Sequence, residues 1–450
     1  MTITYFAVVV CALGFWLRGR RALYGQAICC LFGAGGALIL PGGSNITPAT
    51  AFLPFLLAAA WLARQSDWAR RIPQSGAWLL AYVFWALISA FLLPRALEGW
   101  TYIMTLDRAT GKQLTLIPLR PVSGNVTQTF YVLGGAAVFF AVRELIRSDH
   151  GVITLRDSVL LLGAMNCFAA ILNVAEFYLG LPSLTELTRN GTYANFSAYE
   201  EAGLVRIQGT FPETSSFSGF SIPLFAFSLN LWLRDVRPRY SGSIAIITLT
   251  LLTLSTSGTA YVSLGFYALC FAAHYAITGL FVRRFLRLRS LAILALFVLT
   301  LFGTIVVFEL DIVDRVATFF DRTVASKMST HSGQQRSSWN LQAWQNFLDT
   351  YGIGVGAGSA RASSFAMVLL SNLGALGAML FSLFFLHLFT GKPELLDESR
   401  RTTCIASRHA VFAMLIPALV SGGNVSLGLL FFFFAAGATL TGLASNEPQI

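Results

Sequence analysis

The chain has 450 residues, of which 55% are hydrophobic and 12% are charged, and its mean hydropathy is +0.67. About a quarter of the residues in a soluble domain are charged, so this composition excludes an ordinary soluble protein and indicates one embedded in lipid. The net charge of +10 would suit a nucleic-acid-binding protein. The basic residues, however, form short groups between apolar segments, so we expect no nucleic-acid partner.

Apolar segments close to the roughly 20 residues that a helix needs to cross a bilayer follow one another along the chain. In lipid each must be a helix, because a helix satisfies its own backbone hydrogen bonds. The sequence therefore predicts a single all-α integral-membrane domain, 1–450, with about 12–13 transmembrane helices. The predicted spans are 2–17, 22–40, 46–63, 77–96, 128–146, 158–181, 214–233, 241–256, 259–281, 290–310, 363–390, 405–421 and 425–444.

Basic residues mark one side of the predicted membrane domain. Of the 31 lysines and arginines, 20 lie in every second loop, and the positive-inside rule places those loops in the cytoplasm. The first outer loop (97–127), the second outer loop (182–213) and the large outer loop (311–362) then face outward. On the outward side as a whole, the remaining 11 basic residues stand against 12 acidic ones, so the outer arginines are not explained as topology signals. We expect no disulfide, because no outer loop contains a cysteine.

The large outer loop contains most of the polar sequence outside the spans. Segments 313–328 and 336–349 have the periodicity of amphipathic helices that lie in a membrane interface. Arg336 opens the second helix beside Gly333, where the helix dipole favours an anion. Trp339 has two interpretations, core or interface packing and substrate contact. His331 is the only outward histidine and has no second histidine beside it, which argues against a metal site.

Glycines follow the second helix at two-residue spacing, at 352, 354, 356 and 358. Since glycine allows close approach of a ligand to the backbone, we interpret Gly354 and Gly356 as part of a flexible cavity wall. The first outer loop alternates apolar and polar residues around Leu114 and Leu116, which predicts a short β-hairpin. Either this hairpin caps the outer end of the protein, or Arg120 contacts an anionic ligand.

Two acidic residues are candidates near the second outer loop. Glu176 lies in the outer third of a predicted span, where an ionisable residue is costly and therefore a functional candidate. A structural pairing with an arginine would explain it equally well. Glu213 follows a proline and precedes Thr214 at the start of the next span, so helix capping also explains it. Arg206 lies outside, close to the membrane, and has no acidic residue at helical spacing except Glu200 and Glu201 upstream.

Five motifs together resemble a known family. They are R-I-Q-G-T-F-P-E-T-S-S-F (206–217), L-T-L-S-T-S-G-T (252–259), R-S-S-W-N-L-Q-A-W (336–344), Y-G-I-G-V-G-A-G-S (351–359) and S-N-L-G-A-L-G-A (371–378). In order, spacing and outward side they are similar to those of the O-antigen ligase/polymerase (Wzy-type) superfamily of bacterial polysaccharide polymerases. The motifs cover roughly 200–380, and the predicted topology covers the whole chain.

The resemblance implies a multi-pass glycosyltransferase of the bacterial inner membrane that uses a polyprenyl-diphosphate-linked oligosaccharide at the periplasmic face. It implies no metal and no cofactor, and it allows for flippase and chain-length-regulator partners. The arginines of the family motifs fall on Arg206 and Arg336. Many members have an arginine where this chain has Ser257, and ligases carry a histidine–asparagine pair where this chain has 362–364. These departures favour a polymerase for an exopolysaccharide or O-antigen over a ligase.

A leaving diphosphate accumulates charge, and guanidinium groups bind phosphate in a bidentate manner. We therefore expect Arg206 and Arg336 to bind the diphosphate, with Arg361 or Arg322 in support. Glu213 or His331 is the candidate base for the acceptor hydroxyl. Trp339, Gly354, Gly356 and Glu176 complete the predicted substrate site. A flippase or other transporter of lipid-linked glycans and a non-catalytic assembly partner remain as alternatives from other classes.

Overall fold

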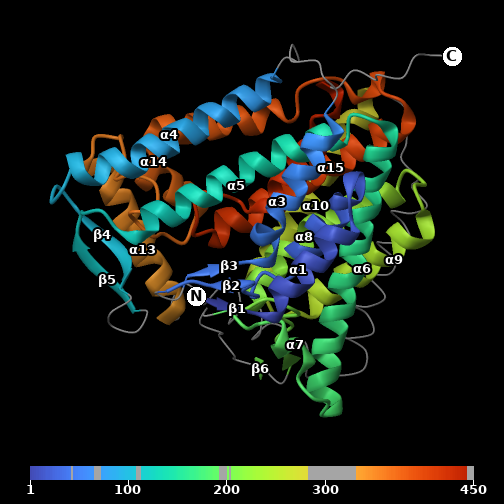
Figure 1. Ribbon diagram of the computed structural model, residues 1–450, viewed down its shortest axis with the longest axis horizontal. Helices are drawn as coiled ribbons and strands as arrows, with labels where there is room; N and C mark the ends of the chain where they lie inside the picture. The colour runs from blue at the N-terminus through green and yellow to red at the C-terminus, as the bar shows by residue number, and fades with distance from the viewer. Residues whose placement is uncertain are drawn as a thin grey trace.

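The computed structural model describes residues 1–41, 44–64, 72–107, 113–191, 200–201, 204–281 and 331–442. The protein is mostly helical (Figure 1). The helices are α1 Tyr5–Trp16, α2 Ala22–Cys30, α3 Pro48–Ala63, α4 Gln74–Ala96, α5 Ser123–Leu145, α6 Asp149–Leu179, α7 Leu184–Leu187, α8 Thr214–Trp232, α9 Pro238–Leu254, α10 Gly258–Phe281, α13 His331–Asp349, α14 Phe365–His387, α15 Glu398–Ser421 and α16 Leu429–Ala438.

Short strands accompany the helices. They are β1 Thr2–Ile3, β2 Leu38–Ile39, β3 Asn45–Ile46, β4 Tyr102–Asp107, β5 Gln113–Pro118, β6 Glu200–Glu201 and β7 Leu204–Val205. The first three form an antiparallel sheet, and the others pair as β4–β5 and β6–β7. The hairpin predicted in the first outer loop is thus confirmed, and the chain is not purely α-helical.

Five helices of the described residues are long and apolar enough to cross a membrane: α4, α5, α6, α14 and α15. Three shorter apolar helices, α1, α3 and α16, accompany them. Long apolar helices of this kind bury their backbone polar groups and are stable in lipid. The protein is accordingly a membrane protein built mainly from helices.

Each predicted span that falls on described residues contains a helix, but the helices in 2–17, 22–40 and 425–444 are shorter than predicted, with 12, 9 and 10 residues. The segment 22–40 is not one span, because α2 ends at Cys30 and is followed by a turn and by β2. Glycines at 33, 35 and 36 explain the early end, since glycine disfavours helix continuation. Nine residues rise only about 14 Å as a helix, which is too short to cross a bilayer. The predicted span 290–310 lies outside the described residues.

The core lies where α8, α15 and α16 pack together, with α5 and α14 beside them. The four phenylalanines 431–434 of α16 are fully buried. Phe384 of α14 stacks on Phe432 and meets Phe139 of α5 edge to face. Such aromatic contacts join three helices that are distant in sequence into one body.

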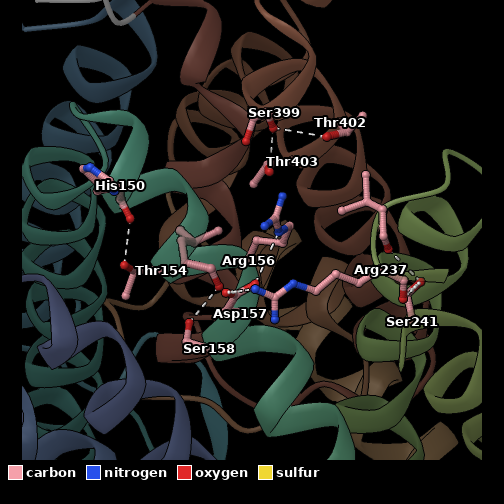
Figure 2. Close-up of polar contacts among 12 residues, drawn as sticks. His150, Thr154, Arg156, Asp157, Ser158, Arg237, Ser241, Ser399, Thr402 and Thr403 are labelled. Atoms are coloured by element: carbon pink, nitrogen blue, oxygen red, sulfur yellow. Dashed lines mark hydrogen bonds and ion pairs between the residues drawn. The ribbon is translucent and has the colours of Figure 1, made fainter. Parts of the chain in front are cut away.

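Three of the loops predicted to face inward meet at one end of the molecule. The buried Arg400 of α15 donates to the Asp149 carboxylate (2.6 Å) and to the carbonyl of Arg147 (2.7 Å). Arg237 donates to Asp157 (2.7 Å), which also pairs with Arg156 (Figure 2). The basic groups that mark this side in the sequence therefore also tie α6, α9 and α15 together.

The opposite end of α5 is held by the hairpin and the glycine loop (351–364). The amide of Asn125 on α5 donates to the Ala357 carbonyl and to the Ser359 hydroxyl, both at 2.8 Å. Ile103 and Leu119 of the hairpin segment are buried in a small separate core with Val355 and Ala360 of the glycine loop. The first and the large outer loops thus form one structural unit.

The glycine loop is packed backbone against backbone. Gly354, Gly356 and Gly358 have φ values of 88°, 95° and 82°, and α14 is kinked where Gly374 has φ 66°. A Cβ on Gly354 would lie 2.6 Å from the backbone nitrogen of Gly374, and one on Gly356 would lie 2.6 Å from the carbonyl oxygen of Ser89. The interpretation of this loop as a flexible wall therefore needs correction. The loop packs between α4, α5 and α14, and this packing requires glycines because a Cβ would overlap the neighbouring backbone.

We predict that Gly356→Ala destabilises the protein more than Gly99→Ala does. Both positions have positive φ, but a Cβ on Gly99 meets nothing within 4 Å. The strain of a left-handed residue is about 1–2 kcal/mol in both variants, and the overlap at Gly356 adds about 1–3 kcal/mol. Thermal unfolding of the two detergent-solubilised variants measures the difference. Equal losses would show that the glycine loop can yield.

Candidate functional site

Arg361 is held in place by three contacts from different parts of the chain. Its backbone N–H donates to the carbonyl of Met104 on β4 (2.8 Å). Two residues later, the N–H of Ser363 donates to Oδ1 of Asn340 on α13 (2.8 Å). The Arg361 guanidinium lies over the ring of Trp339, 5.9 Å from its centroid, within the range of a cation–π contact. The hairpin and α13 together therefore fix the position of this cation.

The charge of Glu213 acts on that of Arg361. Arg361 is exposed, yet the protein around its guanidinium displaces part of the water, and this desolvation lowers the pKa of Arg361. The negative charge of Glu213 acts in the opposite direction and raises this pKa. Glu213 is the residue immediately before α8, and its carboxylate accepts hydrogen bonds from Ser215 (2.6 Å) and Ser216 (3.3 Å). The first, second and large outer loops therefore all contribute to one site.

Arg336 lies on the same side of α13 as this site. The prediction that it opens the helix is wrong, because α13 begins at His331 and passes through Gly333. Gly333 disfavours a helix by only about 1 kcal/mol, which the rest of the helix outweighs. Residues three and four apart share a helix face, so Arg336 lies one turn before Trp339 and Asn340. No hydrogen bond or ion pair joins Arg336 to another described residue.

Arg206 follows β7 and is half-buried. The backbone beyond it is fixed, because the N–H groups of Gln208 and Gly209 both donate to the side-chain oxygen of Asn173 on α6. The buried Arg189 donates to the Gly209 carbonyl (2.5 Å). This turn carries the chain from Arg206 to Glu213 within seven residues. The contacts described do not by themselves join Arg206 to Arg336, so their sharing of one ligand stays a prediction.

Glu176 has a local structural role. Its carboxylate accepts hydrogen bonds from both the backbone N–H and the hydroxyl of Thr185, next to the start of α7. The side chain is buried, and the two hydrogen bonds compensate for its burial. Of the two interpretations of Glu176, the structural one therefore has a physical basis, but its partner is a threonine and not an arginine.

The remaining predicted site residues divide into two groups. Gly354 and Gly356 are buried against the backbones of α14 and α4, so packing explains why they are glycines. Arg322 and the predicted helix 313–328 lie outside the described residues. His331 is the first residue of α13, and its side chain lies outside the described part of the structure.

Sequence reasoning missed the asparagines that hold the site together. The fully buried Asn372 donates to the carbonyls of Ala360 (2.8 Å) and Val368 (3.0 Å) and accepts from the Ala360 N–H (3.0 Å). Asn125 and Asn340 likewise form hydrogen bonds with the backbone of the same loop. The available signal was an amide residue inside or beside an apolar helix, where an unpaired polar group would be costly.

Two buried hydroxyls near the outer ends of α8 and α9 were also missed. Thr214 and Thr256 are each 1% exposed, and neither hydroxyl has a hydrogen-bond partner among the described residues. Thr256 has a φ of 54°, a strained conformation for a β-branched residue. Buried polar groups are normally paired, so water or a ligand would satisfy these two.

We predict that Asn340→Ala lowers stability by about 1–3 kcal/mol, because the buried Ser363 N–H loses its acceptor. The matched control is Gln345→Ala on the same helix, whose exposed amide bonds only to Asp349 one turn away; it should change stability by no more than about 0.5 kcal/mol. Thermal unfolding in detergent compares the two variants. Equal stability of both would show that Asn340 does not fix the segment that carries Arg361.

Comparison of the chain with protein-family models, with curated proteins and with solved structures finds no match. The family resemblance therefore rests on the sequence motifs, and the function rests on the chemistry of the site.

Proposed function

We propose that this membrane protein is a glycosyltransferase that polymerises polyprenyl-diphosphate-linked oligosaccharide repeats at the periplasmic face of a bacterial inner membrane. The observation that carries the proposal is the position of Arg361, which is fixed by the hairpin and α13 and lies within electrostatic range of Glu213. A fixed cation with a carboxylate in its electrostatic range, beside the ends of apolar helices, suits a substrate that has an anionic head and a lipid tail. The motifs shared with the Wzy-type superfamily support the same conclusion.

The proposed reaction needs both a cation, which stabilises the leaving diphosphate, and a base, which takes the acceptor proton. An acceptor hydroxyl attacks the anomeric carbon of the donor sugar, and the bond from that carbon to the diphosphate oxygen breaks. The electron pair leaves with the polyprenyl diphosphate, whose negative charge increases as the bond breaks. Guanidinium groups already in position stabilise this charge without reorganisation. The acceptor proton needs a base within hydrogen-bonding distance.

The geometry changes the order of importance among the arginines. In this proposal Arg361 binds the diphosphate directly, since its backbone and its side chain are both held. Arg336, on the inward face of α13 and free of described partners, supplies a second cation. Arg206 approaches from the second outer loop. Glu213 takes the acceptor proton, and the exposed part of the Trp339 ring offers an apolar surface to a sugar.

We predict that Arg361→Ala lowers the rate of chain extension by a factor of about 10²–10³, the usual cost of removing one group that stabilises a developing anion. Arg361→Lys should recover little of this loss, because lysine lacks the bidentate geometry. Arg336→Ala and Arg206→Ala should also lower the rate. The measurement is polymer length and yield from purified protein in proteoliposomes supplied with lipid-linked repeats.

Arg95→Ala is the matched control for these arginine variants. Arg95 is exposed at the C-terminal end of α4. Among the described residues, its side chain donates to the carbonyl of Phe91 in its own helix and to no other group. It should keep normal activity. Near-normal polymer from correctly inserted Arg361→Ala protein would refute the proposed role of Arg361.

We predict a different defect for Glu213→Gln. The amide keeps the size of the side chain and can still accept hydrogen bonds from Ser215 and Ser216, but it cannot take the acceptor proton. Turnover should fall by a factor of about 10²–10⁴, while binding of the lipid-diphosphate donor is retained. Rapid-quench kinetics with saturating donor, together with a donor-binding assay, separates these effects. The Glu213 side chain makes no capping hydrogen bond to the backbone of α8, so unchanged turnover would leave it only its hydrogen bonds to Ser215 and Ser216 and its charge balance with Arg361.

A further inference from the structure

Helix α13 exposes large apolar side chains on one face. Leu341 is 69% exposed, Trp344 is 42% exposed and Leu348 is 49% exposed. Their spacing of three and four residues puts them on a single stripe of the helix. A stripe of this kind in a water-facing helix would normally point toward the protein core.

The opposite face of α13 is small and polar, although it packs against the protein. Ala343, Asn346 and Thr350 are almost completely buried, and α13 contacts α14 and β4. The amide of Gln342 donates both to the side-chain oxygen of Asn346 and to the carbonyl of Tyr102 on β4, which links this face to the hairpin. The helix therefore has the reverse of the polarity expected for a helix in water.

The exposed face also changes polarity along its length. Its first half consists of Gln334, Gln335 and Ser338, which are exposed and polar. The apolar stripe begins one turn later at Leu341. Contact with water is therefore energetically unfavourable for the C-terminal half of α13.

The apolar stripe continues onto an exposed side of α14. After α13 the chain exposes Tyr351 (85%) and Ile353 (47%). The carbonyl of Gly352, between them, accepts from the N–H of Ala375 just beyond the kink in α14 (2.9 Å). One residue further, Leu376 is exposed on this membrane-spanning helix. The stripe and the spanning helix thus share one surface.

This surface contains a shallow depression lined by Trp100, Leu348, Asp349 and Tyr351. Trp100 is 59% exposed and follows the end of the membrane-spanning helix α4. Among the described lining residues Asp349 is the charged one, and its carboxylate accepts from the Thr101 hydroxyl and the Gln345 amide, both at 2.6 Å. Tryptophan and tyrosine are the residues that membrane proteins place at the boundary between acyl chains and headgroups.

We propose that the C-terminal half of α13, with Trp100 and Tyr351, is seated in one leaflet of the bilayer, and that lipid acyl chains cover the stripe Leu341–Trp344–Leu348. The N-terminal half of α13 rises out of the leaflet into water. The helix thereby holds the Trp339 and Arg361 side of the site at the membrane surface. This inference does not depend on the reaction proposed above, because it rests only on exposure and continuity with the spanning helices.

Fluorescence quenching tests the proposal on the full-length protein. A background with Cys11→Ser and Cys270→Ser removes the two native cysteines that are not buried. Single cysteines at Leu348 and Ser338 then carry an environment-sensitive fluorophore. The labelled proteins are reconstituted in phosphatidylcholine–phosphatidylglycerol vesicles with or without nitroxide groups on the acyl chains.

The label at Leu348→Cys should lose roughly half or more of its fluorescence to the nitroxide lipids, since an interfacial helix buries its apolar face by about 5–10 Å. The label at Ser338→Cys, on the same face but beyond the stripe, should keep its fluorescence. Tyr351→Cys provides a second apolar position if Leu348→Cys does not fold, and it should behave as Leu348→Cys. Equal losses at the apolar position and at Ser338, whether large or small, would overturn the proposal.

Discussion

The close contact between the glycine loop and the helices around it is the constraint on which the candidate site depends. Gly354 and Gly356 bring the loop backbone against α14 and α4 at distances that exclude any Cβ. Asn125 and Asn372 then pair the polar backbone groups that this packing buries. These contacts fix the loop backbone, so the position of Arg361 at its C-terminal part is defined.

The site combines segments that have little stability of their own. A two-stranded hairpin is marginal in water, but here it is covered by α13 and by the glycine loop. In turn it supplies the Met104 carbonyl to the Arg361 N–H, and Thr101 binds Asp349 at the end of α13. Glu213 reaches the same place from the start of α8. A polar site next to lipid needs this mutual support, because unpaired backbone groups there are costly.

The two ends of the molecule use charge differently. At the end where the basic loops gather, arginines form ion pairs with Asp149 and Asp157 and tie helices together. Such pairs give specificity of packing more than net stability. At the other end Arg361 lies over the Trp339 ring, is acted on by the charge of Glu213 and is exposed. The second arrangement leaves the Arg361 cation exposed. The candidate site and the exposed apolar face of α13 lie at this same end.

The sequence alone determined the membrane class, the helices of most spans, the hairpin and the start of α8 at Thr214, because apolar length, alternation and capping are local properties. It could not determine that α2 stops at Cys30 or that α13 begins before Arg336, since boundaries reflect competition between weak local preferences. Only the tertiary structure decided that the glycines pack against backbone, that Glu176 accepts hydrogen bonds from Thr185, and that Glu213 lies within electrostatic range of Arg361. Those outcomes depend on contacts between residues far apart in the chain, and local patterns carry no information about such distances.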